Sequence, residues 1–154
     1  MYEYSELMKV SEVKLSYKIS ANRSEMPIIS ETNEAKRLMS GLFDEDQIEY
    51  RESFCVAFLN KRHRVLGVSR LFDGGVSSCV VDQKVIFQHA LLANASAIIL
   101  AHNHPSGNII PSSEDRKLTD KICKCGDILG IKVLDHIIVD PDGDSFSFSE
   151  NGLI

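Results

Sequence analysis

The chain has 154 residues, 44% of them hydrophobic and 25% charged, and a formal net charge of −5, which suits one globular domain and argues against a general electrostatic grip on nucleic acid. No apolar run approaches the roughly 18 residues that a membrane span needs, and the N-terminus does not resemble a signal peptide, so we expect a cytoplasmic protein with no membrane partner. In that compartment the cysteines at positions 55, 79, 123 and 125 are expected to be reduced thiols.

The N-terminal stretch is predicted to be an arm outside the main domain. Residues 1–29 form this arm, and residues 30–154 form the domain. Within the arm, residues 13–19 alternate apolar and polar side chains, which is typical of a half-buried strand. The exposed edge of such a strand could pair with a second copy of the chain, so the sequence leaves a homo-oligomer open.

The domain is predicted to alternate helices and strands. A helix is expected to begin with Ser30 or Thr32 as its N-cap and to end within residues 39–42. Strands are expected next at residues 53–60 and 64–72, and residues 76–81 are a candidate for a further short strand. Asp82 then caps a helix over residues 83–93.

The densest cluster of residues that could bind a metal or take part in catalysis follows a buried strand predicted at residues 97–101. The chain continues as His102-Asn103-His104-Pro105-Ser106-Gly107, and two prolines and a glycine make residues 105–111 a loop. Ser112 is expected to cap a helix that runs to about Leu129, where Gly130 stops it. The last strands are expected at residues 131–140 and 145–148.

Three of these residues are expected to meet as a metal site. His102 and His104 project to the same face of the strand end, because side chains alternate with a period of two. The following helix returns the Asp115 carboxylate towards them from its first turn. Two histidines and one carboxylate are the ligand count of a catalytic zinc site, which keeps its fourth position for water. The alternative is that Ser112 and Asp115 only cap the helix and the histidines are only packed, which explains each residue but not their convergence.

The other histidines are expected to play lesser parts. His63 lies in a short connection between strands and His89 on a helix, where surface or packing roles are more common than ligation. His136 follows Asp135 in a predicted strand, and it could be a fourth ligand or could support the ligands from behind. We favour a hydrogen-bonded core histidine there, because three ligands are already supplied elsewhere.

Hydrolysis at such a site also needs a carboxylate that is not a ligand. It would take a proton from the attacking water and give it to the leaving amine. Glu52, at the start of a predicted strand, is the first candidate, with Glu49 second and Glu114 third; the alternative for Glu52 is a solvated charge at a strand end. Ser112 is well placed to donate a hydrogen bond to a tetrahedral oxyanion.

Together, Glu52, His102-x-His104-Pro105 and Ser112-x-x-Asp115 resemble the signature of the JAMM (MPN) metalloproteases. The fuller string, with Arg51, Pro111 and Asp135-His136-Ile137-Ile138, is similar to the RadC branch of that superfamily over roughly residues 30–154. Asn103 stands where eukaryotic deubiquitinating members carry Ser or Thr.

The resemblance implies an α/β fold with a mixed, curved sheet flanked by helices, an architecture like that of cytidine deaminases. It also implies that His102, His104 and Asp115 hold Zn²⁺, that Glu52 is the general acid/base and that Ser112 steadies the transition state.

The sequence is compatible with three functions. The first is a zinc-dependent metallopeptidase-like hydrolase of the RadC type, in which water on the metal attacks a peptide or isopeptide carbonyl of an unknown protein or peptide substrate. The second is an accessory protein of DNA repair or mobile elements, which the family label suggests but the net charge of −5 does not support. The third is a non-catalytic metal-binding scaffold. We favour the first, because the whole set of ligands and a candidate base are present.

Overall fold

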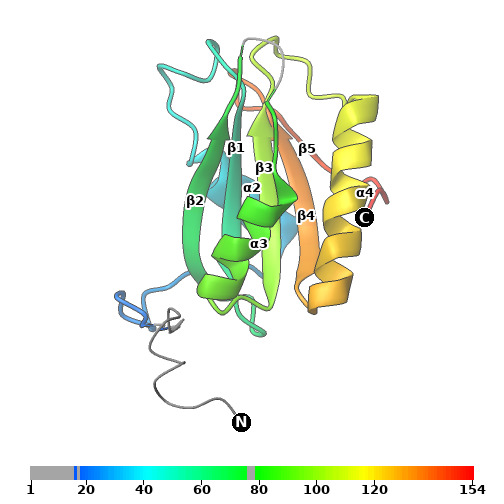
Figure 1. Ribbon diagram of the computed structural model, residues 1–154. Coiled ribbons are helices and arrows are strands. Elements are labelled where there is room, and N and C mark those ends of the chain that lie inside the picture. Colours follow the sequence, from blue (N-terminus) through cyan, green and yellow to red (C-terminus); the bar gives the residue numbers. More distant parts are fainter. Residues whose placement is uncertain (1–15, 17, 76–78) are drawn as a thin grey trace, which may run out of the picture.

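The computed structural model describes residues 16, 18–75 and 79–154, and their strands form one mixed sheet with helices on both faces (Figure 1). The strands run in the order β2-β1-β3-β4-β5. Their bounds are Ser53–Leu59 for β1, Val65–Asp73 for β2, Ala97–Asn103 for β3, Lys132–Val139 for β4 and Ser145–Ser147 for β5. The helices are α2 (Thr32–Ser40), α3 (Gln83–Leu92) and α4 (Ser113–Leu129). This arrangement confirms the predicted α/β class.

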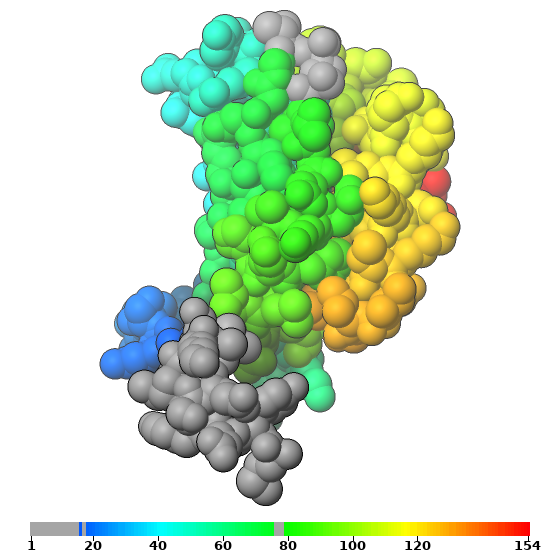
Figure 2. Space-filling view, viewed as in Figure 1, coloured from blue at the N-terminus to red at the C-terminus, as the bar shows by residue number. Residues whose placement is uncertain are grey.

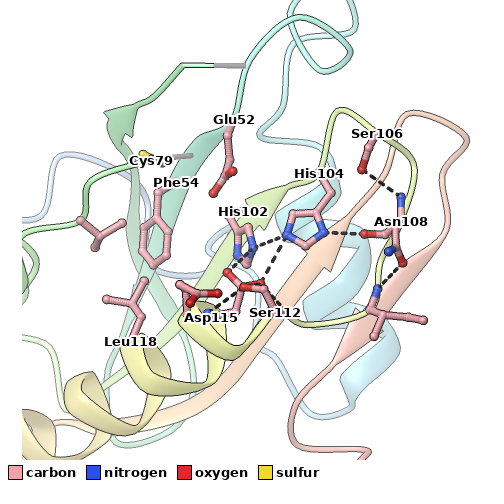
Figure 3. Close-up of a pocket in the computed structure, with 13 residues that line it drawn as sticks. Glu52, Phe54, Cys79, His102, His104, Ser106, Asn108, Ser112, Asp115 and Leu118 are labelled. Atoms are coloured by element: carbon pink, nitrogen blue, oxygen red, sulfur yellow. Dashed lines mark hydrogen bonds and ion pairs between the residues drawn. The ribbon is translucent and has the colours of Figure 1, made fainter. Parts of the chain in front are cut away.

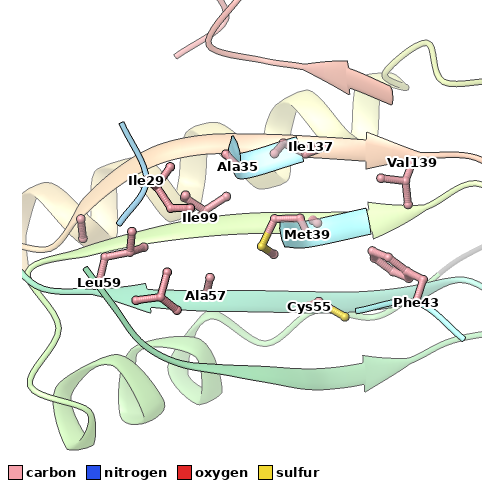
Figure 4. Packing of buried hydrophobic residues seen from close by; sticks show 13 residues of the cluster. Ile29, Ala35, Met39, Phe43, Cys55, Ala57, Leu59, Ile99, Ile137 and Val139 are labelled. Carbon is pink, nitrogen blue, oxygen red and sulfur yellow. The ribbon is translucent and has the colours of Figure 1, made fainter. Parts of the chain in front are cut away.

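The two central strands are buried along their whole length, because helices cover the sheet on both sides. Every residue of β1 and of β3 is buried. Odd-numbered residues of both strands, such as Ala57 and Ile99, pack with Met39 of α2 (Figure 4). Even-numbered residues, such as Phe58 and Leu100, pack under α3 and α4. Period-two alternation therefore builds two cores from the same strands.

The α3 and α4 face is the one that carries the chemistry described below. In the space-filling view these two helices lie over the same face of the sheet (Figure 2). Helix α4 connects the parallel strands β3 and β4, as a crossover between parallel strands requires. It ends at Gly130, whose φ of 68° lies in the left-handed region that glycine adopts without strain. A Cβ at Gly126 would lie 2.3 Å from the Ile131 carbonyl oxygen, so this position needs glycine for a close approach.

Most predicted element boundaries are confirmed, and the start of α2 is the main exception. The prediction gave Ser30 or Thr32 as its cap, whereas Glu31 occupies that position. The carboxylate of Glu34 reaches back and accepts hydrogen bonds from the Ser30 and Glu31 N–H groups, at 2.6 and 3.2 Å. Glu34, at the third helical position, therefore satisfies the N–H groups of the cap residue and of the residue before it, as the acid of a capping box does.

Two predicted strands fall partly or mostly on residues that the structure does not describe. Residues 13–15 and 17 of the first, and residues 76–78 of the second, lie outside the described residues. Residues 79–81 are described and belong to no strand, so Cys79 lies in an irregular segment. All four cysteines are free thiols. Within the described ranges, none of the helices is long and apolar enough to cross a membrane.

Candidate metal centre and active site

The sheet register brings the candidate residues to one end of β1 and β3. These strands pair antiparallel with Phe54 opposite His102, and continuing that register by two residues sets Glu52 opposite His104. Helix α4 starts beside the same strand end and supplies Asp115 from its first turn. Figure 3 shows Glu52, His102, His104, Ser112 and Asp115 around one pocket. The local patterns that predicted a strand, a loop and a capped helix therefore produce the convergence.

The two histidines and the aspartate form a compact donor set. The Nε2 atoms of His102 and His104 are 2.9 Å apart, and they lie 3.2 and 3.5 Å from the two carboxylate oxygens of Asp115. Ligands at about 2.0–2.2 Å from a tetrahedral ion are separated by about 3.3–3.6 Å, which is close to the two distances from the histidines to Asp115 and somewhat longer than the distance between the histidines. Among the described residues, this trio is the group able to hold a metal ion. The structure thus brings together all three predicted ligands.

Hydrogen bonds behind the ligands orient them. The Nδ1 atom of His104 is bonded to the backbone carbonyl of Asn108, which can only accept. In neutral His104, Nδ1 therefore carries the proton and the lone pair of Nε2 faces the donor set. Ser112, the predicted cap of α4, donates its hydroxyl to the Asp115 carboxylate at 2.7 Å and accepts from the Asp115 N–H at 3.1 Å. Ser112 therefore fixes the third candidate ligand in place.

The electrostatics of the trio favour an ionised aspartate. Burial raises the pKa of Asp115, but the adjacent imidazoles of His102 and His104 outweigh it and hold that pKa well below its usual range. Burial lowers the pKa of His104, and its hydrogen bonds to Asp115 and to the Asn108 carbonyl outweigh that effect and raise it. A carboxylate and two imidazoles packed this closely provide a strongly cation-attracting set.

Glu52 lies beside the donor set without belonging to it. Its side chain points towards the histidines in Figure 3, and it lines the same pocket of about 580 Å³. Burial raises the pKa of Glu52, while the nearby charges of His102 and His104 lower it in part; the net shift is upward. Of the other two candidate bases, Glu114 also lines the pocket but is exposed, bonded to Ser113, and Glu49 does not line it.

His136 is the core histidine that the sequence favoured, and it also contacts the candidate ligand His102. Its side chain is fully buried, with Nε2 2.8 Å from Nδ1 of His102 and Nδ1 2.6 Å from the Thr119 hydroxyl. It therefore lies behind His102 and outside the donor trio. His63 lies in the β1–β2 turn, and the exposed His89 is bonded to the Val85 carbonyl on α3, so neither joins the trio.

Sequence reasoning missed the parts played by Asn103 and Thr119. The Asn103 amide donates to the carbonyls of Ile48 and Arg51, at 2.8 and 2.9 Å, and accepts from the Ser53 N–H at 2.7 Å. It therefore ties the strand between the two histidines to the segment that carries Glu52. In the sequence, strand alternation already places the polar side chain of Asn103 on the face opposite its two histidine neighbours, where it needs hydrogen-bond partners. For Thr119 the available signal was the i, i+4 spacing from Asp115.

The chemical capacity of this pocket is that of a metal centre with an adjacent proton-transfer group. Its lining combines polar residues with apolar side chains, among them Phe54, Val81 and Leu118. In a comparison with known families, residues 29–153 match the model of the RadC-like JAB domain. Because that match spans most of the chain and includes every residue of the candidate site, the protein belongs to the RadC-like JAB domain family.

Proposed function

We propose that this protein is a zinc-dependent hydrolase that cleaves a peptide or isopeptide bond. The observation that carries the proposal is the position of Glu52, a partly buried carboxylate beside a His-His-Asp donor set but outside it. A closed structural zinc site would use four protein ligands and would need no free carboxylate at its side. Three ligands with a neighbouring base are typical of hydrolytic centres.

The donor chemistry favours zinc over the common oxygen-seeking ions. Two imidazole nitrogens supply most of the donor set, whereas Mg²⁺ and Ca²⁺ prefer oxygen ligands. When bound, zinc polarises a carbonyl oxygen and lowers the pKa of water to near neutrality. His102, His104 and Asp115 would hold the ion, and the pocket that they line would receive the substrate.

The residues of the chain then carry the proton transfers. Glu52 accepts a proton from the attacking water and passes it to the leaving nitrogen as the C–N bond breaks. Its raised pKa suits both steps, because a base with a pKa nearer neutrality is also a usable acid. Ser112 is proposed to donate to the oxyanion, which requires its hydroxyl to turn from the Asp115 carboxylate that it contacts in the resting arrangement.

The test combines metal content with hydrolysis in the full chain and three variants. The wild type is expected to hold about one zinc ion per chain and to cleave members of a panel of fluorogenic peptides and lysine isopeptides. Glu52→Gln should keep the metal and lose at least about 100-fold in rate, the usual contribution of a general base. His104→Ala should lose both metal and activity, and Glu49→Gln, the control, should lose neither.

Two outcomes would count against the proposal. Glu52→Gln hydrolysing as fast as the wild type would remove Glu52 from the chemistry. A zinc-loaded wild type that cleaves nothing in the panel would instead support a metal-binding scaffold.

A further inference from the structure

We propose that His136 and Thr119 form a buried hydrogen-bond relay that fixes the tautomer of His102, so that its Nε2 lone pair faces the metal. His136 and Thr119 would then be positioning residues for a ligand that they hold from behind. The inference rests on the metal-binding half of the proposed function and is independent of whether the protein hydrolyses a bond.

The direction of the relay is set at Thr119. Its hydroxyl has one proton and two close neighbours, the Asp115 carbonyl oxygen at 2.6 Å and Nδ1 of His136 at 2.6 Å. A carbonyl oxygen has no proton to give, so the hydroxyl must donate to it. The same hydroxyl oxygen is then free only to accept. Nδ1 of His136 must therefore carry a proton and donate it to Thr119.

The proton on Nδ1 of His136 decides the state of His102. His136 is fully buried among apolar rings, and burial disfavours a charged imidazole, so its Nε2 is left with a lone pair. That lone pair lies 2.8 Å from Nδ1 of His102, which must then be the donor. A neutral His102 with its proton on Nδ1 presents Nε2 to the metal as a lone pair.

Packing holds the relay in this geometry. Phe148 stacks on the His136 ring with centroids 4.9 Å apart, and Phe54 meets the same ring edge-on at 5.6 Å. The other end of the relay also contacts the metal site, since the carbonyl that accepts from Thr119 belongs to Asp115. It thus connects one metal ligand on β3 with another on α4 through β4.

The two histidine ligands are therefore held in different ways. His104 is oriented by a backbone carbonyl, that of Asn108, which no side-chain substitution removes. His102 is oriented by a side chain, which is in turn oriented by another side chain. If the relay ran in the opposite direction, His136 would donate to Nδ1 of His102, and the proton of His102 would move to Nε2, where it would block the metal.

The experiment uses two pairs of variants in the full chain. Thr119→Val removes the hydroxyl at almost constant volume, and Thr119→Ser keeps it as the matched control. His136→Leu removes the acceptor for His102, while the side-chain amide of His136→Gln can restore both an acceptor and a donor. Zinc affinity is measured by competition with a chromophoric chelator. Long-range ¹H–¹⁵N NMR of the imidazoles reads the tautomers in metal-free protein at mildly alkaline pH.

The relay predicts that His102 and His136 are both Nδ1–H tautomers in the wild type and in Thr119→Ser. His136→Leu should lower zinc affinity by about 10–100-fold, the usual effect of removing a group that supports a ligand. Thr119→Val should abolish the single tautomer of His102 and weaken zinc binding in the same direction. His136→Gln should recover most of the affinity that His136→Leu loses.

Several results would overturn the relay. An Nε2–H tautomer of His102 in the wild type would do so, as would Thr119→Val that keeps both wild-type tautomer and affinity. Equal zinc affinity for His136→Leu and the wild type would do the same. A wild type that binds no zinc would refute the proposed function, while its imidazole spectrum would still decide the relay.

Discussion

Asn103 makes three hydrogen bonds inside the protein, and Asn103→Leu removes them at nearly constant volume. The side chain is fully buried, and so is Ser53, whose N–H would lose its partner. The Ile48 and Arg51 carbonyls would lose the amide too, although their residues are less buried. An orphaned buried group costs about 1–3 kcal/mol and each of the two other bonds about 0.5–1.5 kcal/mol, so we expect the free energy of unfolding to fall by roughly 2–6 kcal/mol.

The loss should also separate metal binding from catalysis. Asn103 ties β3 to the segment that carries Glu52, so its removal should displace Glu52 more than the histidines, which have partners of their own. Urea unfolding measures the stability, and chelator competition and the peptide panel measure the two activities. Zinc affinity should change by less than the hydrolysis rate.

The matched control is Asn33→Leu, at an exposed position on α2, which should change stability by no more than about 0.5 kcal/mol. The reasoning would be refuted if Asn103→Leu were as stable as this control. Equal losses of zinc affinity and hydrolysis would show that Asn103 does not act through Glu52.

Further predictions concern single sites. Gly126→Ala, which in an ordinary helix would be stabilising, should cost about 1–3 kcal/mol in urea unfolding, because the new Cβ would meet the Ile131 carbonyl oxygen at 2.3 Å; a gain in stability would contradict this. Ser112→Ala should cost about 0.5–2 kcal/mol as a lost cap, and an effect on the hydrolysis rate larger than the effect on zinc affinity would support its oxyanion role. Burial raises the pKa of Cys79 from 9.0 to about 11, so the fraction of reactive thiolate at neutral pH is about 100-fold smaller than for an ordinary thiol. Alkylation by iodoacetamide, followed by mass spectrometry, should therefore be slow at neutral pH and accelerate in alkali. Zinc should raise the thermal unfolding midpoint of the wild type, by an amount that grows with its concentration, and should leave His104→Ala unchanged.

The sequence predicted what neighbouring residues determine. Ser112 and Gly130 mark the ends of α4 because a cap and a left-handed glycine act within one helical turn. The convergence of His102, His104 and Asp115 was predictable for the same reason, since one strand end, one loop and one helix start contain all three.

The rest depends on contacts between distant segments. Asn103 pairs with residues about fifty positions away, and its partners are backbone atoms that leave no trace in the sequence. The bond from His136 to Thr119 depends on how far β4 and α4 are shifted along one another, and hydrophobic periodicity does not determine that shift. The cap of α2 was misassigned because Glu31 occupies the cap position, with Glu34 bonded to the N–H groups of Ser30 and Glu31.

Because β1 and β3 pair in a fixed antiparallel register, inserted residues should be tolerated differently at the two ends of β1. Phe54 faces His102 across this pair, and side chains alternate between faces, so one residue inserted between β1 and Glu52 would turn Glu52 away from the metal centre towards α2. The connection between β1 and β2 lies at the far end of β1, where added residues leave that pairing unchanged. Natural insertions, affinity tags or reporter peptides should therefore be tolerated better at the exposed Lys61 and Arg62 than next to residue 52.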